Sequence, residues 1–169
     1  MARRASRFPL RARIAWHALT RGAGRRPPVE DVRRVLIAHN LLLGDTLMLT
    51  GLLARLKDRY PHARLVMTCP PAFLPLYEGR PYGVVTVPFD PRDRHSLDRL
   101  RALGPFDLVF CRNVMIYFDT QTKKNILKQL HGTMFRGGWL MLGGVETAFG
   151  VEEFFERRTV GNAPVYVAR

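Results

Sequence analysis

Polar side chains that could do chemistry stand at a few places where an apolar run gives way to a loop or helix. The candidates are Asp45, Asp90, Arg112, Asn113 and Tyr117. A carboxylate at a strand-to-helix turn, such as Asp45, can take a proton from an attacking hydroxyl group. The polar residues after later apolar runs are expected at the carboxyl ends of strands, where open parallel sheets bind their ligands.

The elements that must position these residues follow from the hydrophobic pattern. Short apolar runs alternate with helical periodicity from Arg33 onward, which is typical of a parallel sheet covered by helices. Strands are expected at residues 33–39, 63–69, 84–89, 106–111, 137–144 and 163–169, helices at 45–60, 93–104 and 120–135, and a short helix or turn at 151–158. The prediction is an α/β fold: a single Rossmann-like three-layer domain, with a mostly parallel twisted sheet and helices on both faces.

Composition limits the class of protein. A chain of 169 residues is long enough for one domain with a single core. Its 47% apolar and 24% charged residues are ordinary for a soluble globular protein. Cys69 and Cys111 lie in apolar stretches without paired spacing, so we expect buried reduced thiols in a cytoplasmic protein, and neither a metal site nor a disulfide.

The net charge of +13 is concentrated at the start of the chain. Residues 1–28 contain eight arginines and no acidic residue, so residues 1–32 are interpreted as a basic arm before a domain at 33–169. Such an arm could make weak contact with an anionic membrane or another polyanion, and a peripheral location at the inner membrane is one expectation. Nothing in the pattern indicates specific nucleic-acid binding, and oligomer formation stays open.

The first part of the domain resembles a known family through "LLLGDTLMLTGLLARLKDRYP" and the residues that follow it. From about Arg33 to Val109 the sequence looks like the start of the heptosyltransferases, which transfer a sugar from a nucleotide donor to lipopolysaccharide precursors. The resemblance implies that Gly44 and Asp45 line an acceptor cleft, with Asp45 as general base. The alternative is that Asp45 caps the following helix. The nucleotide-sugar domain of that family is not expected in this chain.

The second part resembles another family through "FDLVFCRNVMIYFD". Residues 106–169 are similar to the C-terminal part of the chemotaxis-receptor glutamate methyltransferases, the CheR family. The resemblance implies that Arg112 and Asn113 border S-adenosylmethionine and that Tyr117 lies near its methyl group. Alternatively, Asn113 satisfies loop backbone groups, and Tyr117 is a core aromatic with a solvated hydroxyl.

Other parts of a cofactor site are not evident from the sequence. The first turn, "HNLLLGD", is bulky, and the second strand ends in Met67-Thr68-Cys69-Pro70 without the carboxylate that usually binds ribose hydroxyls. Asp90 is the one candidate substitute for that carboxylate.

Composition also changes along the chain, because residues 1–105 contain 18 Arg and 11 Pro, whereas residues 106–169 contain five Arg and one Pro. We therefore interpret the chain as a recombined Rossmann-like domain, joined near residues 106–110 and without efficient catalysis. One alternative is a CheR-type methyltransferase with a degenerate site for S-adenosylmethionine, the only cofactor that the sequence suggests. The other is a truncated heptosyltransferase-like acceptor domain. If the chain is active, the sequence slightly favours methyl transfer.

Overall fold

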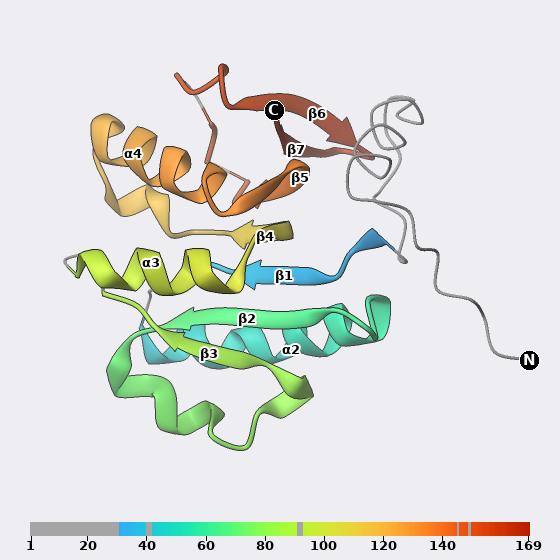
Figure 1. Ribbon diagram of the computed structural model, residues 1–169, viewed down its shortest axis with the longest axis vertical. Coiled ribbons are helices and arrows are strands. Elements are labelled where there is room, and N and C mark those ends of the chain that lie inside the picture. The colour runs from blue at the N-terminus through green and yellow to red at the C-terminus, as the bar shows by residue number, and fades with distance from the viewer. Residues whose placement is uncertain (1–30, 40–41, 91–92, 145, 149) are drawn as a thin grey trace, which may run out of the picture.

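A computed structural model describes residues 31–39, 42–90, 93–144, 146–148 and 150–169. Seven strands form one sheet in the order β3-β2-β1-β4-β5-β7-β6 (Figure 1). The strands are β1 (Arg34–Ile37), β2 (Arg64–Cys69), β3 (Val85–Pro88), β4 (Phe106–Cys111), β5 (Met134–Leu142), β6 (Phe155–Val160) and β7 (Ala163–Ala168). Strands β1 to β5 run parallel to one another, and β7 is antiparallel to both β5 and β6. The predicted mostly parallel α/β sheet is confirmed.

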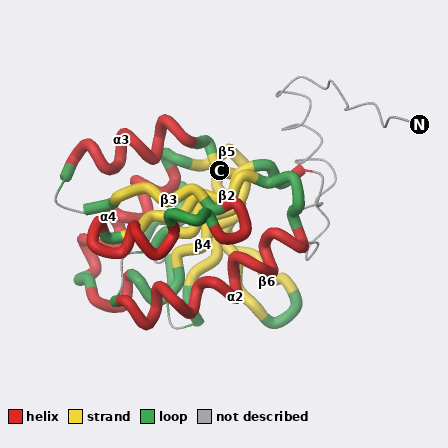
Figure 2. The backbone as a smooth tube through the Cα atoms, turned by 90° about the horizontal axis from the view of Figure 1, so that it is seen from below, coloured by secondary structure: helices red, strands yellow, loops and turns green. Residues whose placement is uncertain are grey.

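Helices cover both faces of the sheet, as expected for three layers. The α-helices in the described residues are α2 (Leu43–Arg59), α3 (Arg94–Leu103) and α4 (Thr120–His131). Leu53 and Leu56 of α2 pack in one buried cluster with Val35 of β1. Leu100 of α3 and Leu127 of α4 belong to a separate cluster, and α2 and α3 lie on opposite sides of the sheet (Figure 2). Alternate residues of the central strands, such as Val35 and Leu36 of β1, therefore pack into two separate cores.

The three helices begin in different ways. Asp93 and Asp119 are the N-caps of α3 and α4, and each accepts a hydrogen bond from a backbone N–H of the first turn, that of His95 and that of Thr122. These backbone bonds lower the pKa of both carboxyl groups, since they stabilise the ionised form. Helix α2 instead has Leu42 as its N-cap, with no side-chain hydrogen bond.

Three expectations about elements were wrong or incomplete. Residues 155–158 belong to strand β6, whereas a short helix or turn was expected there. Residues 70–83, for which no helix was expected between the strands at 63–69 and 84–89, contain two 3-10 helices, Pro71–Tyr77 and Pro81–Gly83. Helix α4 ends at His131, so residues 134–135, assigned to that helix, start β5.

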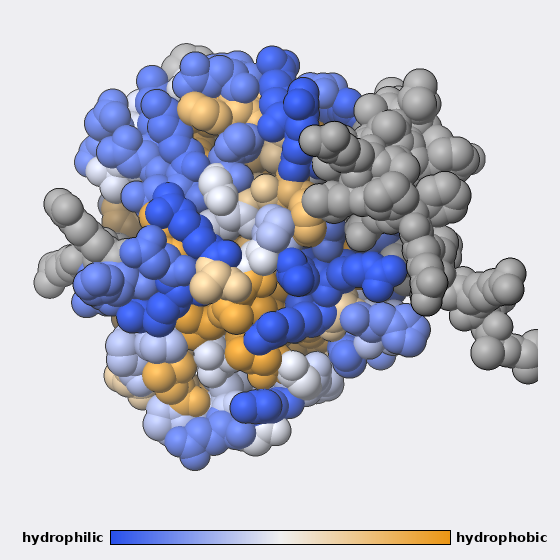
Figure 3. Space-filling view, viewed as in Figure 1, coloured by the Kyte–Doolittle hydropathy of each residue, from blue (hydrophilic) through white to orange (hydrophobic). Residues whose placement is uncertain are grey.

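The surface over α3 and α4 is mainly hydrophilic, and an apolar area lies in the region of β2 and β3 (Figure 3). Among the described residues, no helix is both long and apolar enough to cross a membrane. The basic arm predicted at residues 1–32 falls almost wholly outside the described part, so its membrane or polyanion contact stays a prediction.

Candidate cofactor pocket

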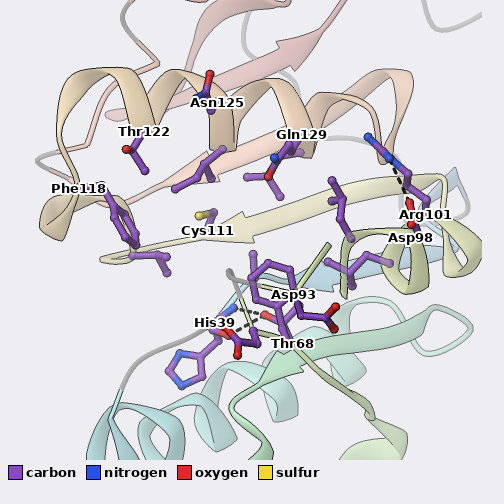
Figure 4. A pocket seen from close by; sticks show the side chains of 18 residues that line it. His39, Thr68, Asp93, Asp98, Arg101, Cys111, Phe118, Thr122, Asn125 and Gln129 are labelled. Carbon is purple, nitrogen blue, oxygen red and sulfur yellow. Dashed lines mark hydrogen bonds and ion pairs between the residues drawn. The ribbon is translucent and has the colours of Figure 1, made fainter. Parts of the chain in front are cut away.

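A pocket of about 520 Å³ lies between α3 and α4 at the carboxyl ends of the central strands. Figure 4 shows α4 residues Thr122 and Gln129 on one side, and His39 and Thr68 on the other. Much of the lining is apolar, and its members include Ala38, Phe89, Leu97, Leu100, Cys111, Val114, Phe118, Ile126 and Leu130. Polar lining residues come from the strand ends and the two helices. This is the edge at which open α/β sheets bind ligands.

His39 joins the pocket floor to α2. Its backbone N–H donates to Thr68 Oγ1 at 2.6 Å, and Thr68 Oγ1 donates to the His39 carbonyl at 2.7 Å. The imidazole turns toward α2, where its Nε2 lies 2.6 Å from Thr46 Oγ1. Because Thr46 Oγ1 donates to the Leu42 carbonyl, it is left to accept from Nε2. Burial lowers the pKa of His39, although the charge of Asp45 raises it, so the ring is held neutral near pH 7.

Cys111 contributes a thiol to the pocket wall that is not reactive. Burial, with the nearby charge of Glu146, raises the pKa of Cys111 to about 12. A thiol that stays protonated is a poor nucleophile. Burial also raises the pKa of Cys69. Both cysteines are free and buried, as the sequence predicted.

Of the five candidate site residues, Asp90 alone lines this pocket. Asp90 is exposed just after β3, and its backbone N–H donates to Ser96 Oγ at the start of α3. Ser96 Oγ in turn donates to Asp93 Oδ2, so the loop before α3 is held by a short chain of hydrogen bonds. The position suits a carboxylate that faces a ligand at the strand ends.

Arg112, Asn113 and Tyr117 are exposed in the loop after β4 and lie outside the lining. Tyr117 is 70% exposed, so the alternative of a core aromatic was wrong. Asn113 has a positive φ of 60° and bonds the neighbouring loop through its backbone N–H. Their neighbours Val114 and Phe118 line the pocket instead. The loop after β4 therefore borders the pocket, but the three polar residues predicted to bind the cofactor are exposed to solvent.

Asp45 lies apart from these residues. It is exposed in the first turn of α2 and does not line the pocket. The alternative that it caps the helix was wrong, because Leu42 is the N-cap; Asp45 does face the positive end of the helix dipole. Its role as a general base stays a prediction.

Sequence reasoning missed two buried polar residues at this edge, His39 and Glu146. Each makes a hydrogen bond to a segment far away in the sequence, and a local sequence pattern cannot predict such a contact. The one available signal was a charged or ionisable side chain inside or next to an apolar run. In the described part of the chain, no group of three or more His, Cys, Asp or Glu side chains could hold a metal ion.

Comparison with known proteins supports one of the two family resemblances. Residues 86–162 match the family model "CheR methyltransferase, SAM binding domain". This segment runs from β3 through the β6–β7 turn and supplies α3, α4 and most of the pocket lining. The match begins well before Phe106, where we expected this resemblance to start.

Curated relatives match a stretch of similar length. Chemotaxis protein methyltransferase Cher2 of Pseudomonas putida is 41% identical over 78 residues, which are 46% of this chain and 28% of that protein. Chemotaxis protein methyltransferase 1 of Pseudomonas aeruginosa is 40% identical over 78 residues, with the same coverage. The chain therefore spans little more than a quarter of the length of these relatives.

Solved structures extend the likeness of fold to the whole domain. The MycE methyltransferase of mycinamycin biosynthesis, in complex with Mg and SAH, has a TM-score of 0.54 at 16% identity, over 83% of this chain and 42% of its own. An O-methyltransferase family protein from Burkholderia thailandensis has a TM-score of 0.53 at 13% identity, over 94% of this chain and 55% of its own. The fold is thus a Rossmann-like methyltransferase fold. The heptosyltransferase resemblance of residues 33–109 and the join near 106–110 stay predictions.

Proposed function

We propose that this chain binds S-adenosylmethionine in the pocket between α3 and α4 and serves in CheR-type methyl transfer. The observation that supports this most is the family match at residues 86–162, because it covers the elements that build the pocket. The seven-stranded order with an antiparallel β7 agrees with it. We therefore favour the alternative of a CheR-type methyltransferase over the interpretation of the chain as a recombined domain without efficient catalysis.

The residues of the pocket fit the cofactor. S-adenosylmethionine, when bound, supplies an electrophilic methyl group on a sulfonium. Apolar side chains such as Phe89, Val114 and Phe118 can enclose the flat adenine ring, and Asp90 can accept hydrogen bonds from ribose hydroxyls. The neutral His39 network would keep the floor of the pocket rigid.

The acceptor is inferred from the resemblance to the chemotaxis-receptor glutamate methyltransferases, with which the relatives' names, chemotaxis protein methyltransferases, agree. We propose a glutamate carboxylate of a receptor, which attacks the methyl group directly. Arg112 and Tyr117 lie exposed beside the pocket wall, where a cationic guanidinium and a phenol could hold an anionic acceptor. Because the chain spans 28% of the first relative, other parts of that protein have no counterpart in this match.

A second candidate is a domain that binds the cofactor without efficient transfer. The observation favouring it is that β2 ends at Cys69 without a carboxylate, while the predicted cofactor residues after β4 lie outside the lining. Binding would then depend mainly on Asp90 and the apolar walls.

Transfer of a labelled methyl group from S-adenosylmethionine to a receptor fragment tests the proposal. Val114→Trp should place an indole ring inside the pocket and strongly reduce transfer, whereas Ile116→Trp, an exposed position in the same loop, should retain it. Binding of S-adenosylhomocysteine without transfer would support the second candidate. Equal activity of both tryptophan variants would show that methyl transfer does not use this pocket.

A further inference from the structure

Glu146, in the loop that follows β5, is a carboxylate with 5% exposure and three backbone partners. Its Oε2 accepts hydrogen bonds from Asn113 N at 2.8 Å and from Gly143 N at 2.7 Å, and its Oε1 accepts from Met115 N at 2.7 Å. One side chain thus ties the loop after β4 to the loop after β5. Bonds from N–H groups to an ionised acceptor are about twice as strong as neutral ones.

The contact also holds an unusual backbone conformation. Asn113 has a φ of 60°, a left-handed conformation that asparagine tolerates better than most residues but that is uncommon outside glycine. The N–H of Asn113 is one of the three that Glu146 binds. Gly143 completes the arrangement, because a Cβ there would lie 2.6 Å from Glu146 Oε2 and 2.7 Å from Asn113 Oδ1. The two loops are therefore packed together without room for a further methyl group.

The bonds fall on both sides of a pocket residue. Asn113 and Met115 directly flank Val114, and Val114 lines the pocket while its two neighbours do not. Fixing the N–H groups on either side of Val114 fixes the direction of its side chain. It also fixes where the exposed Arg112 and Tyr117 emerge.

We propose that Glu146 is a positioning residue of the cofactor pocket, whose carboxylate holds the Asn113–Met115 backbone so that Val114 forms the wall. This inference rests on the proposed function, since the pocket is taken to hold S-adenosylmethionine. Glu146 acts through the loop and does not itself line the pocket.

The test is Glu146→Gln, compared with Asp107→Asn. Glutamine keeps the shape but has one accepting oxygen in place of two, so at least one backbone N–H loses its partner. Asp107 offers a matched control, because its Oδ2 accepts from Arg33 N and Arg34 N, both at 2.9 Å. Those bonds lie at the amino ends of β1 and β4, away from the pocket. Both variants remove one charge from a carboxylate that binds backbone.

Two readouts separate positioning from general stability. Calorimetric titration with S-adenosylhomocysteine should show binding about tenfold weaker or more in Glu146→Gln, equivalent to losing one charge-assisted hydrogen bond, and within about twofold of wild type in Asp107→Asn. Amide hydrogen exchange of the unliganded protein should become faster at residues 113 and 115 only in Glu146→Gln.

Several results would overturn the inference. Unchanged affinity in Glu146→Gln, or equal weakening in both variants, would reduce Glu146 to a structural residue. Unchanged exchange at residues 113 and 115 would show that it does not hold the loop. If wild-type protein binds no S-adenosylhomocysteine, the proposed function fails and this inference fails with it, whereas binding by wild type with no difference between the variants overturns the inference alone.

Discussion

Gly143 has no side chain, and the side chains of Glu146 and Asn113 occupy the space beside it. Substituting Gly143 therefore tests how tightly the two loops are packed. In Gly143→Ala the new Cβ would stand 2.6 Å from Glu146 Oε2 and 2.7 Å from Asn113 Oδ1, so these side chains must move and the hydrogen bonds of Glu146 are disturbed. We expect the free energy of unfolding to fall by about 1–3 kcal/mol, as for overpacking. Urea denaturation measures this change. Gly144→Ala, where no atom lies within 4 Å of the new Cβ, should change stability by about 0.5 kcal/mol or less, and an equal loss there would contradict the account.

His39 makes stability depend on pH. Its pKa in the folded protein is lowered from 6.5 by burial, so the unfolded chain binds a proton at higher pH than the folded one. Protonation therefore favours unfolding, and the free energy of unfolding should fall as pH drops from about 6.5 toward the folded pKa. Urea denaturation between pH 7.5 and pH 5.5, in steps of about half a unit, measures the slope.

The comparison for this effect is between His39→Gln and His62→Gln. His39→Gln should flatten the pH dependence, and His62→Gln, at an exposed position, should keep the wild-type slope. Acidic groups such as Asp93 and Asp119 have lowered pKa values, so their contribution is lost at lower pH, outside this window. A wild-type slope in His39→Gln would show that another group is responsible.

At the residue scale, sequence predicted where the site lies better than which side chains form it. Asp90 could be found because a polar residue after a buried strand must lie at the carboxyl edge. Glu146 could not, because its partner Asn113 is 33 residues away and bonds through backbone. The left-handed conformation of Asn113 was not predicted either, because asparagine adopts that region only in some loops.

At the scale of elements, helix α2 has apolar residues on both its buried and its exposed face, and mutations can test which face packs on the sheet. Leu53 is fully buried under the sheet, whereas Met48 is 81% exposed on the same helix. Leu53→Ala should reduce the free energy of unfolding by about 2–5 kcal/mol through cavity formation. Met48→Ala should change it by about 0.5 kcal/mol or less. Similar losses by urea denaturation at both positions would mean that the orientation of α2 is wrong.

Element types with strong periodicity were predicted, and the weaker ones were not. The helical periodicity of α2 and the apolar runs of β1, β2 and β4 indicated their structures correctly. Strand β6 was missed because "FERR" is largely polar, as suits an edge strand that pairs with β7 alone. Its hydrogen bonds to β7, rather than its composition, make it a strand.

For the whole molecule, the arginine-rich arm gives a prediction about partners. Replacing the eight arginines of residues 1–28 with glutamine should reduce association with anionic vesicles, because each basic residue near such a surface contributes about 1 kcal/mol. Vesicle sedimentation at low and high salt measures this, with neutral vesicles as the control. Association that survives the substitutions, or that ignores salt, would rule out the arm as the contact.

The central claim concerns the pocket that the whole fold assembles at the carboxyl ends of its strands. Thermal unfolding with S-adenosylmethionine or S-adenosylhomocysteine tests it most directly. At about 100 times the dissociation constant, either ligand should raise the free energy of unfolding by about 2.7 kcal/mol, with no effect of a nucleotide-sugar. No shift up to millimolar ligand, or an equal shift with the nucleotide-sugar, would contradict the claim that this chain has a methyltransferase cofactor site.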